Sequence, residues 1–114
     1  AATATMVYFV ARMIGCFTGG IVLSKISNRV GILVCGTGIG MALAADKVAG
    51  VRASSITSVP FAELFRQHNN GNVVCLSGRF VDLDLNKEIV KTFLTTEFEG
   101  GRHEARVAKV MALD

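Results

Sequence analysis

The residues best suited to chemistry lie together in one stretch, Cys35-Gly36-Thr37-Gly38-Ile39-Gly40. An apolar run over residues 31–34 precedes this stretch and a helix-forming run begins at Met41, so we predict a buried strand, a glycine turn and a helix in that order. The N-terminus of the helix would direct free backbone N–H groups at an anion. A cysteine beside such an electropositive end is favoured in its thiolate form. We therefore interpret the stretch as a site with Cys35 as its reactive group.

The spacing of the glycines argues against a nucleotide as the ligand. Gly36, Gly38 and Gly40 do not match G-x-G-x-x-G, because the third glycine comes one residue early, and no Gly-Lys-Ser/Thr of a Walker loop follows. Nucleotide binding is therefore the weakest hypothesis. A tight turn without any ligand explains the glycines alone about as well as a binding site does. The Cys35 thiol and the Thr37 hydroxyl in the same turn favour a site, in which backbone N–H groups hold an oxyanion such as an enediolate.

Two further groups of residues are candidates for function. His68-Asn69 follows a predicted helix and precedes a turn, where a histidine fits a general acid or base and a C-terminal helix cap equally well. Arg102 and Arg106 share one helix face after two glycines. They fit either a phosphate clamp at a helix N-terminus or a solvated basic face. Because cations at this end oppose the helix dipole, a bound anion is a physical reason to prefer the clamp.

The elements that must position these residues alternate between strand and helix, which predicts an α/β fold with a parallel sheet. Strands are expected at 31–35, 51–55 and 73–76, helices at 7–17, 38–48, 58–67, 82–95 and 102–113, and either state at 21–26. Ser58 is expected to cap one helix at its start and Gly50 another at its end. Ligands of such sheets lie beyond the carboxyl ends of the strands, where Cys35 and Ser77-Gly78-Arg79 fall. Three strands are few, so either a partner chain completes the sheet or N-terminal strands are missing.

Composition excludes several classes of protein. The chain has 114 residues, of which 51% are hydrophobic and 18% charged, so a single domain over residues 1–114 has ample material for a core. A net charge of +3 without a Lys/Arg cluster argues against nucleic acid. Uncharged runs at 1–11 and 13–24 fall short of the roughly 18 residues of a membrane span. Cys16, Cys35 and Cys75 form no Cys-x-x-Cys motif, which argues against disulfides and zinc and predicts a cytoplasmic protein; Cys16 and Cys75, in apolar segments, are interpreted as buried.

Four segments match known motifs in order and spacing. They are Cys-Gly-Thr-Gly-Ile-Gly-Met (35–41), Ala-Asp-Lys-Val-Ala-Gly-Val-Arg-Ala (45–53), Arg-Gln-His-Asn-Asn (66–70) and Phe-Glu-Gly-Gly-Arg-His-Glu-Ala-Arg-Val (98–107). From about Tyr8 onward the chain resembles the B-type ribose-5-phosphate isomerases, a family that includes galactose-6-phosphate isomerase subunits. The resemblance implies a cofactor-free aldose–ketose isomerase, acting on ribose 5-phosphate and ribulose 5-phosphate or a related sugar phosphate. It also implies a Rossmann-like three-layer fold and a homodimer or dimer of dimers with active sites at the interface.

The resemblance assigns a role to each candidate. Cys35 matches the base that moves the proton between C1 and C2, and His68 matches the group that opens the sugar ring, with Thr37 nearby. The turn over 36–40 would hold the enediolate through the backbone of Gly36, Thr37, Gly38, Ile39 and Gly40. Asn69 would contact sugar oxygens. Arg79, Arg102 and Arg106 match the positions that bind the substrate phosphate. No metal is implied.

The chain also departs from the family pattern. Family members begin with a strand that ends in Asp-His, a helix, a second strand and an Asp-Tyr-Pro loop, and none of these is found here. We therefore expect a fold with its N-terminal strands missing. Asp46 stands where the family usually has Asn. The rival hypothesis is a catalytically degenerate module that binds sugar phosphate or only dimerises. Five-carbon and six-carbon substrates fit the sequence equally.

Overall fold

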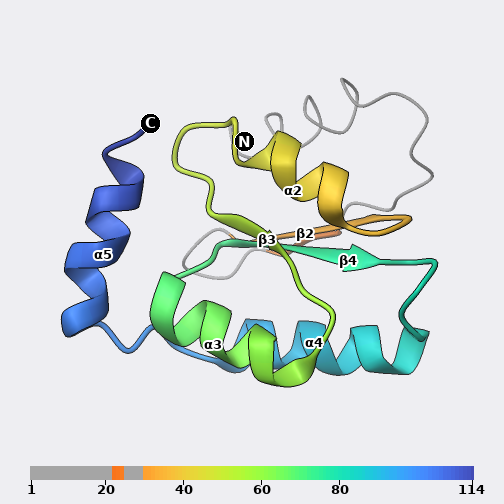
Figure 1. Ribbon diagram of the computed structural model, residues 1–114. Coiled ribbons are helices and arrows are strands. Elements are labelled where there is room, and N and C mark those ends of the chain that lie inside the picture. The colour runs from red at the N-terminus through yellow and green to blue at the C-terminus, as the bar shows by residue number, and fades with distance from the viewer. Residues whose placement is uncertain (1–21, 25–29) are drawn as a thin grey trace.

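The computed structural model describes residues 22–24 and 30–114 of the chain. Within these ranges it forms a four-stranded sheet of order β1-β2-β4-β3 (Figure 1). The strands are β1 (Val22–Ser24), β2 (Val30–Cys35), β3 (Ala53–Ser55) and β4 (Val73–Ser77). The helices are α2 (Ile39–Ala45), α3 (Val59–Asn69), α4 (Leu83–Thr95) and α5 (Arg102–Met111). The predicted helix at 7–17 lies outside the described residues.

The strands β2, β4 and β3 are parallel, which confirms the predicted α/β architecture. Residues 22–24, which fitted a helix or a strand, form β1 and pair with β2 in the antiparallel direction. Only five residues, 25–29, separate these two strands. A parallel pair needs a crossover of a dozen residues or more, so a connection of this length permits only the antiparallel arrangement.

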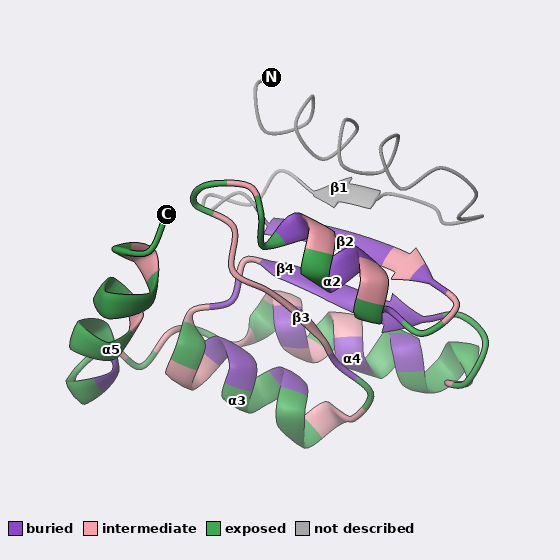
Figure 2. Cartoon of the chain, turned by 45° about the horizontal axis from the view of Figure 1, so that its top comes forward, coloured by how far each residue is buried: buried purple, intermediate pink, exposed green. Residues whose placement is uncertain are grey.

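The sheet lies between two helical layers, as expected. Helix α2 covers one face, and α3 and α4 cover the other (Figure 1). Side chains of β2 and β4 alternate between these layers: Ile32 and Val74 pack toward α3 and α4, whereas Leu33 and Cys75 pack toward α2. The buried residues gather accordingly on the strands and on the helix faces that meet them (Figure 2). Alternation places the Cys35 side chain on the α2 side.

Helix α3 follows the sequence prediction at its start. The Ser58 hydroxyl accepts a hydrogen bond from the Phe61 N–H at 3.4 Å, and Pro60 lies in the first turn. At its end the helix runs two residues beyond the predicted boundary. Asn70 closes it in a left-handed conformation with φ of 48°. This extension places His68 and Asn69 in the last turn of the helix.

The prediction for α2 was wrong at its end. The helix stops at Ala45 with Asp46 as its C-terminal cap, instead of continuing to residue 48 with Gly50 as cap. The N–H groups of Lys47 and Val48 turn back to the carbonyls three residues earlier, which tightens the chain into a turn. The Asp46 carboxylate then accepts a hydrogen bond from the Ala53 N–H at 2.7 Å, which holds β3 against the end of the helix. No helix within the described part of the chain has the length and apolar character that a membrane span needs.

Candidate active site

Cys35, the last residue of β2, is 5% exposed. Its sulfur accepts a hydrogen bond from the Gly38 N–H at 3.1 Å. Glycine is required at position 38, because its φ is +82° and an added Cβ would lie 3.0 Å from the Cys75 carbonyl oxygen and from Ser55 Oγ. The tight turn thus folds a backbone donor onto the thiol.

The side chains of Cys35 and Thr37 stabilise the turn by accepting hydrogen bonds from its backbone. Thr37 Oγ1 accepts a hydrogen bond from the Ile39 N–H at 3.2 Å, so this donor and the Gly38 N–H are engaged inside the turn. The first intrahelical bond of α2 joins the Ala42 N–H to the Gly38 carbonyl. By helix geometry, the donors that remain in the first turn of α2 belong to Gly40 and Met41.

Neighbouring strands fix the turn from outside. Ser77 Oγ donates to the Gly36 carbonyl at 2.7 Å, and Ser55 Oγ donates to the Thr37 carbonyl at 3.2 Å. Arg79 lies beside the same turn. Its N–H donates to the Gly36 carbonyl at 3.2 Å, and its guanidinium carbon lies 3.8 Å from where a Cβ of Gly36 would be. The structure therefore brings Arg79, an exposed cation, to the Cys35 end of the sheet.

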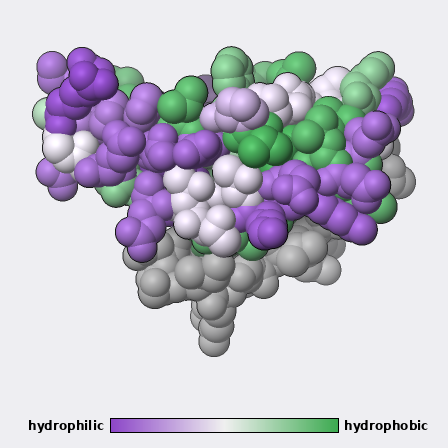
Figure 3. All heavy atoms as spheres, turned by 90° about the horizontal axis from the view of Figure 1, so that it is seen from below, coloured by the Kyte–Doolittle hydropathy of each residue, from purple (hydrophilic) through white to green (hydrophobic). Residues whose placement is uncertain are grey.

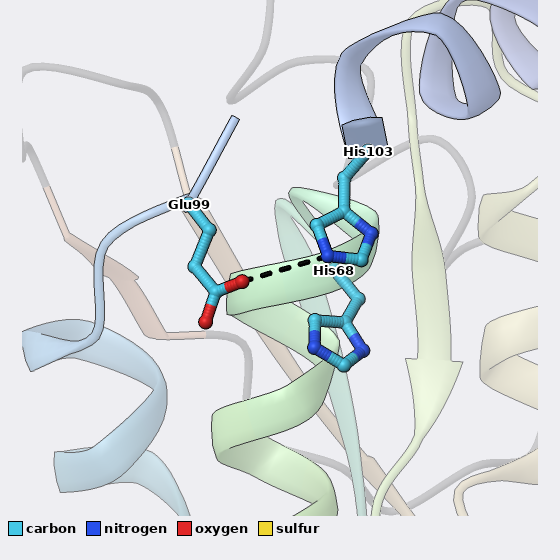
Figure 4. Close-up of side chains that lie close together, drawn as sticks. All are labelled: His68, Glu99 and His103. Atoms are coloured by element: carbon cyan, nitrogen blue, oxygen red, sulfur yellow. Dashed lines mark ion pairs between the residues drawn. The ribbon is translucent and has the colours of Figure 1, made fainter. Parts of the chain in front are cut away.

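The second group of candidates lies where α3 meets α5. The His68 ring stacks on the His103 ring, with centroids 4.3 Å apart and planes 13° from parallel. His103 is 5% exposed, and its Nε2 lies 3.5 Å from Glu99 Oε2 (Figure 4). Among the described residues, these three side chains form the group of possible metal ligands whose donor atoms all lie within 4.8 Å of one another. Asn69 is exposed at the adjacent end of α3.

The electrostatics of this junction favour a neutral His103. Burial lowers the pKa of His103, and the nearby His68, Arg102 and Arg106 lower it further, while Glu99 raises it. At neutral pH the ring therefore carries no charge and keeps one lone pair. The basic surroundings of His103 are suited to an anionic ligand.

A cleft of about 790 Å³ lies at this junction. His68, Asn69 and Arg106 line it, and Arg102, the first residue of α5, does not. Asp46 also lines the cleft, and its carboxylate accepts the hydrogen bond from the Ala53 N–H. The full lining consists of Asp46, Val51, Arg52, Ala53, Ser54, Phe65, His68, Asn69, His103, Arg106, Val107, Val110, Met111, Leu113 and Asp114. Cys35 and Thr37 are not part of it.

The two groups of candidates lie at opposite ends of the sheet. Cys35 pairs with Ser77 at the carboxyl ends of β2 and β4, whereas α3 leads from His68 into the beginning of β4 at Val73 (Figure 1). The five residues of β4 alone span about 13 Å. One chain therefore joins Cys35 with Arg79, and His68 with Asn69 and Arg106, but does not join the two groups.

Some residues near the site carried little signal in the sequence. Glu99 and His103 belong to the motif at residues 98–107, which gives neither of them a role. Only the packing of α5 on α3 reveals that His103 contacts both Glu99 and His68. Ser77 was placed at a strand end without a role. The interpretation of Cys75 as a core residue is confirmed, because it is fully buried, and its burial, with Asp46 and Cys35 nearby, raises its pKa to about 12. Cys16 lies outside the described residues.

The sequence and the fold agree in identifying the family. Residues 18–110 match the family described as Ribose/Galactose Isomerase, and the chain belongs to this family. It is 48% identical over 87 residues to the probable ribose-5-phosphate isomerase B of Mycoplasma pneumoniae, covering 76% of this chain and 57% of that protein. It is 46% identical over 84 residues to ribose-5-phosphate isomerase B of Escherichia coli, covering 74% of this chain and 56% of that protein.

Solved structures give the same result. The chain is similar to ribose-5-phosphate isomerase B of Mycoplasma genitalium with bound ribulose-5-phosphate, with a TM-score of 0.76 and 43% identity over 96% of this chain and 66% of that one. It is also similar to the type B enzyme of Trypanosoma brucei, with a TM-score of 0.75 and 39% identity over 98% of this chain and 67% of that one. The chain spans 54–57% of the length of the first three curated relatives.

Proposed function

We propose that this chain acts as an aldose–ketose isomerase that interconverts ribose 5-phosphate and ribulose 5-phosphate, with each active site built from two copies of the chain. The observation that carries the proposal is Cys35, at the end of β2 with a backbone N–H on its sulfur, in a chain of the Ribose/Galactose Isomerase family. The relative from Mycoplasma genitalium, whose structure contains ribulose-5-phosphate, supports the choice of substrate.

In the proposed mechanism Cys35 transfers the proton. Its thiolate removes the proton from C2 of the open-chain aldose and returns it to C1, while the proton on O2 passes to O1, so that the C1 carbonyl becomes a hydroxyl and C2 becomes the carbonyl. The cis-enediolate between these steps is stabilised by backbone N–H groups of the turn over 36–40 and of the first turn of α2, where those of Gly40 and Met41 have no intrahelical partner. Thr37 supports the turn through its bond with the Ile39 N–H.

The His68 end of the sheet supplies the groups for ring opening and most of the groups that bind the phosphate. His68 shuttles protons between the ring oxygen and O1 of the cyclic sugar, because an imidazole both gives and accepts protons near neutral pH. Asn69 binds sugar hydroxyls. Arg102 and Arg106 on α5, with Arg79 at the Cys35 end, bind the phosphate through charge-assisted hydrogen bonds.

Two copies are proposed because one chain separates these groups by the length of the sheet. A two-fold dimer places the Cys35 end of one copy against the His68 end of the other and makes two equivalent sites. Exposed apolar side chains beside the glycine turn support this contact: Ile39 is 56% exposed, Leu43 66% and Phe80 72%. On the face of α3 and α4, hydrophobic side chains likewise reach the surface among hydrophilic ones (Figure 3). A dimer of dimers preserves the same arrangement.

The cytoplasm is the proposed location, because the mechanism needs Cys35 as a free thiol and cytosolic reductants keep thiols reduced. A coupled assay that follows formation of ribulose 5-phosphate from ribose 5-phosphate tests the function. The proposal predicts turnover by the chain and its loss in Cys35→Ala. Turnover that survives this substitution would contradict the mechanism. A chain that is stabilised by ribose 5-phosphate without converting it would instead be a binding module.

A further inference from the structure

Both histidines of the chain converge with one carboxylate where α5 packs on α3. Figure 4 shows the Glu99 carboxylate directed at the His103 ring and the His68 ring stacked against the same ring. The donor atoms of the three side chains all lie within 4.8 Å of one another. The side chains come from three separate segments, namely the end of α3, the loop before α5 and the first turn of α5.

We propose that His68, Glu99 and His103 form a binding site for a divalent transition-metal ion of the class that prefers imidazole ligands, with Zn²⁺ as the reference ion. Two imidazoles and one carboxylate are a ligand set that zinc uses in open sites, where a water molecule or an added ligand takes the fourth position. The spacing of zinc-binding motifs in sequence could not reveal this group, because 34 residues of chain lie between the two histidines.

The geometry needs only a small adjustment to hold the ion. Metal bonds of about 2.0–2.2 Å in a tetrahedron place ligand atoms about 3.4 Å from one another. His103 Nε2 and Glu99 Oε2 are already 3.5 Å apart. His68 must tilt out of the stack to direct a lone pair at the same point, because two parallel rings do not aim their lone pairs at one point. The half-buried His68 at a helix end has room for this tilt, whereas burial fixes His103.

Some charges at the junction favour a bound cation and others oppose it. Glu99 contributes a negative charge. Arg102 and Arg106 lie on the same helix as His103, and their positive charges oppose a cation. An anion in the fourth position, such as inorganic phosphate, would offset them, so we expect phosphate to strengthen metal binding.

The metal site shares His68 with the proposed active site. An ion bound there would hold the His68 lone pair and stop it from moving protons, so the metal would inhibit isomerisation. This consequence rests on the proposed function. Metal binding itself does not, because it can be measured on the chain in the absence of any sugar.

Calorimetric titration of the chain with Zn²⁺ in a non-chelating buffer at neutral pH tests the site. We expect one ion to bind per chain. Glu99→Gln and His103→Gln should each raise the dissociation constant by at least about tenfold, since even the loss of groups behind a metal ligand costs about 10- to 100-fold. Glu97→Gln is the matched control, because Glu97 is exposed in the same loop and is not one of the three ligands. It should bind Zn²⁺ as the unaltered chain does.

Co²⁺ provides a second measurement that needs no variant. Its visible spectrum should show coordination by nitrogen and oxygen without a thiolate charge-transfer band, which would separate the site from Cys35. Equal Zn²⁺ affinity of the unaltered chain and Glu99→Gln would overturn the proposal, as would a thiolate band that disappears in Cys35→Ser. If His103→Gln fails to fold, Glu99→Gln and the Co²⁺ spectrum decide alone. A chain that isomerises ribose 5-phosphate but binds no metal overturns this inference and leaves the proposed function intact.

Discussion

The hydroxyl of Ser77 donates a hydrogen bond to the carbonyl oxygen of Gly36 at 2.7 Å and accepts one from the Phe80 N–H at 3.0 Å. It thereby ties the turn that follows Cys35 to the end of the neighbouring strand. Asn86 of α4 reaches the same point and donates to the Ser77 carbonyl at 2.8 Å. The position of the proposed base therefore depends on residues from β4 and α4 that have no role of their own in the proposed mechanism.

Ser77→Ala should destabilise the fold by about 1–3 kcal/mol, because Ser77 is 2% exposed and its hydroxyl makes two hydrogen bonds, to the Gly36 carbonyl and from the Phe80 N–H. Urea unfolding measures this change. Ser54→Ala, on the other face of β3 from Ser55, is the control and should cost less than about 0.5 kcal/mol. An equal effect of the two substitutions would show that the Ser77 bond does not hold the turn.

Gly38→Ala should destabilise the chain by at least about 2 kcal/mol. The new side chain would combine a left-handed backbone with contacts at 3.0 Å to the Cys75 carbonyl and Ser55 Oγ. Gly36→Ala is the matched control, because a Cβ there meets only the Arg79 guanidinium carbon at 3.8 Å. Thermal unfolding of both variants tests the difference. A Gly36 variant less stable than the Gly38 variant would contradict this account of the turn.

The stability of the chain should fall in acid through His103. Because the folded pKa of His103 lies below the ordinary 6.5, the unfolded chain binds the proton first as pH falls. The stabilising contribution is thus complete above pH 6.5 and is lost as the pH falls from 6.5 through the folded pKa. Urea unfolding at about pH 7.5 and 5.5 measures the loss. His103→Gln should flatten this pH dependence, and an unchanged slope would exclude His103 as its source.

Arg106→Ala should raise the KM for ribose 5-phosphate by about 10- to 100-fold, since a hydrogen bond to a charged group is worth about 1.5–3 kcal/mol. It should also reduce thermal stabilisation by inorganic phosphate. Arg102→Ala should act in the same direction. Lys109→Ala removes an exposed charge from the same helix and is the control. If Lys109→Ala weakens binding as much as Arg106→Ala, the effect is one of general charge and not of a phosphate site.

The sequence predicted the helices and strands whose formation depends mainly on their own residues. The apolar runs that became β2 and β4 are buried on both faces, which explains why their patterns are continuous. Helix α2 ends early because tertiary contacts decide its boundary: Asp46 binds the Ala53 N–H, a partner that its local sequence does not specify. Such a contact overrides helix propensity.

The candidate site was predictable residue by residue, but only part of its arrangement was. Cys35 and Arg79 were expected at the carboxyl ends of strands and lie there. His68 ends a helix that leads into a parallel strand, so the predicted topology already implies a position at the other end of the sheet from Cys35, and the structure has it there. The contact between His68 and His103 was not predictable, because it depends on how α5 packs against α3.

The central claim is that Cys35 of one copy works with His68 of another. Mixing the inactive variants Cys35→Ala and His68→Ala, after dissociation and reassembly, tests it directly in the ribulose 5-phosphate assay. The account predicts recovery of about a quarter of the unaltered activity, because random pairing makes half of the dimers mixed and each mixed dimer has one intact site of two. If both residues worked within one chain, no mixed dimer would hold an intact site. A mixture no more active than its separate components would therefore contradict the claim.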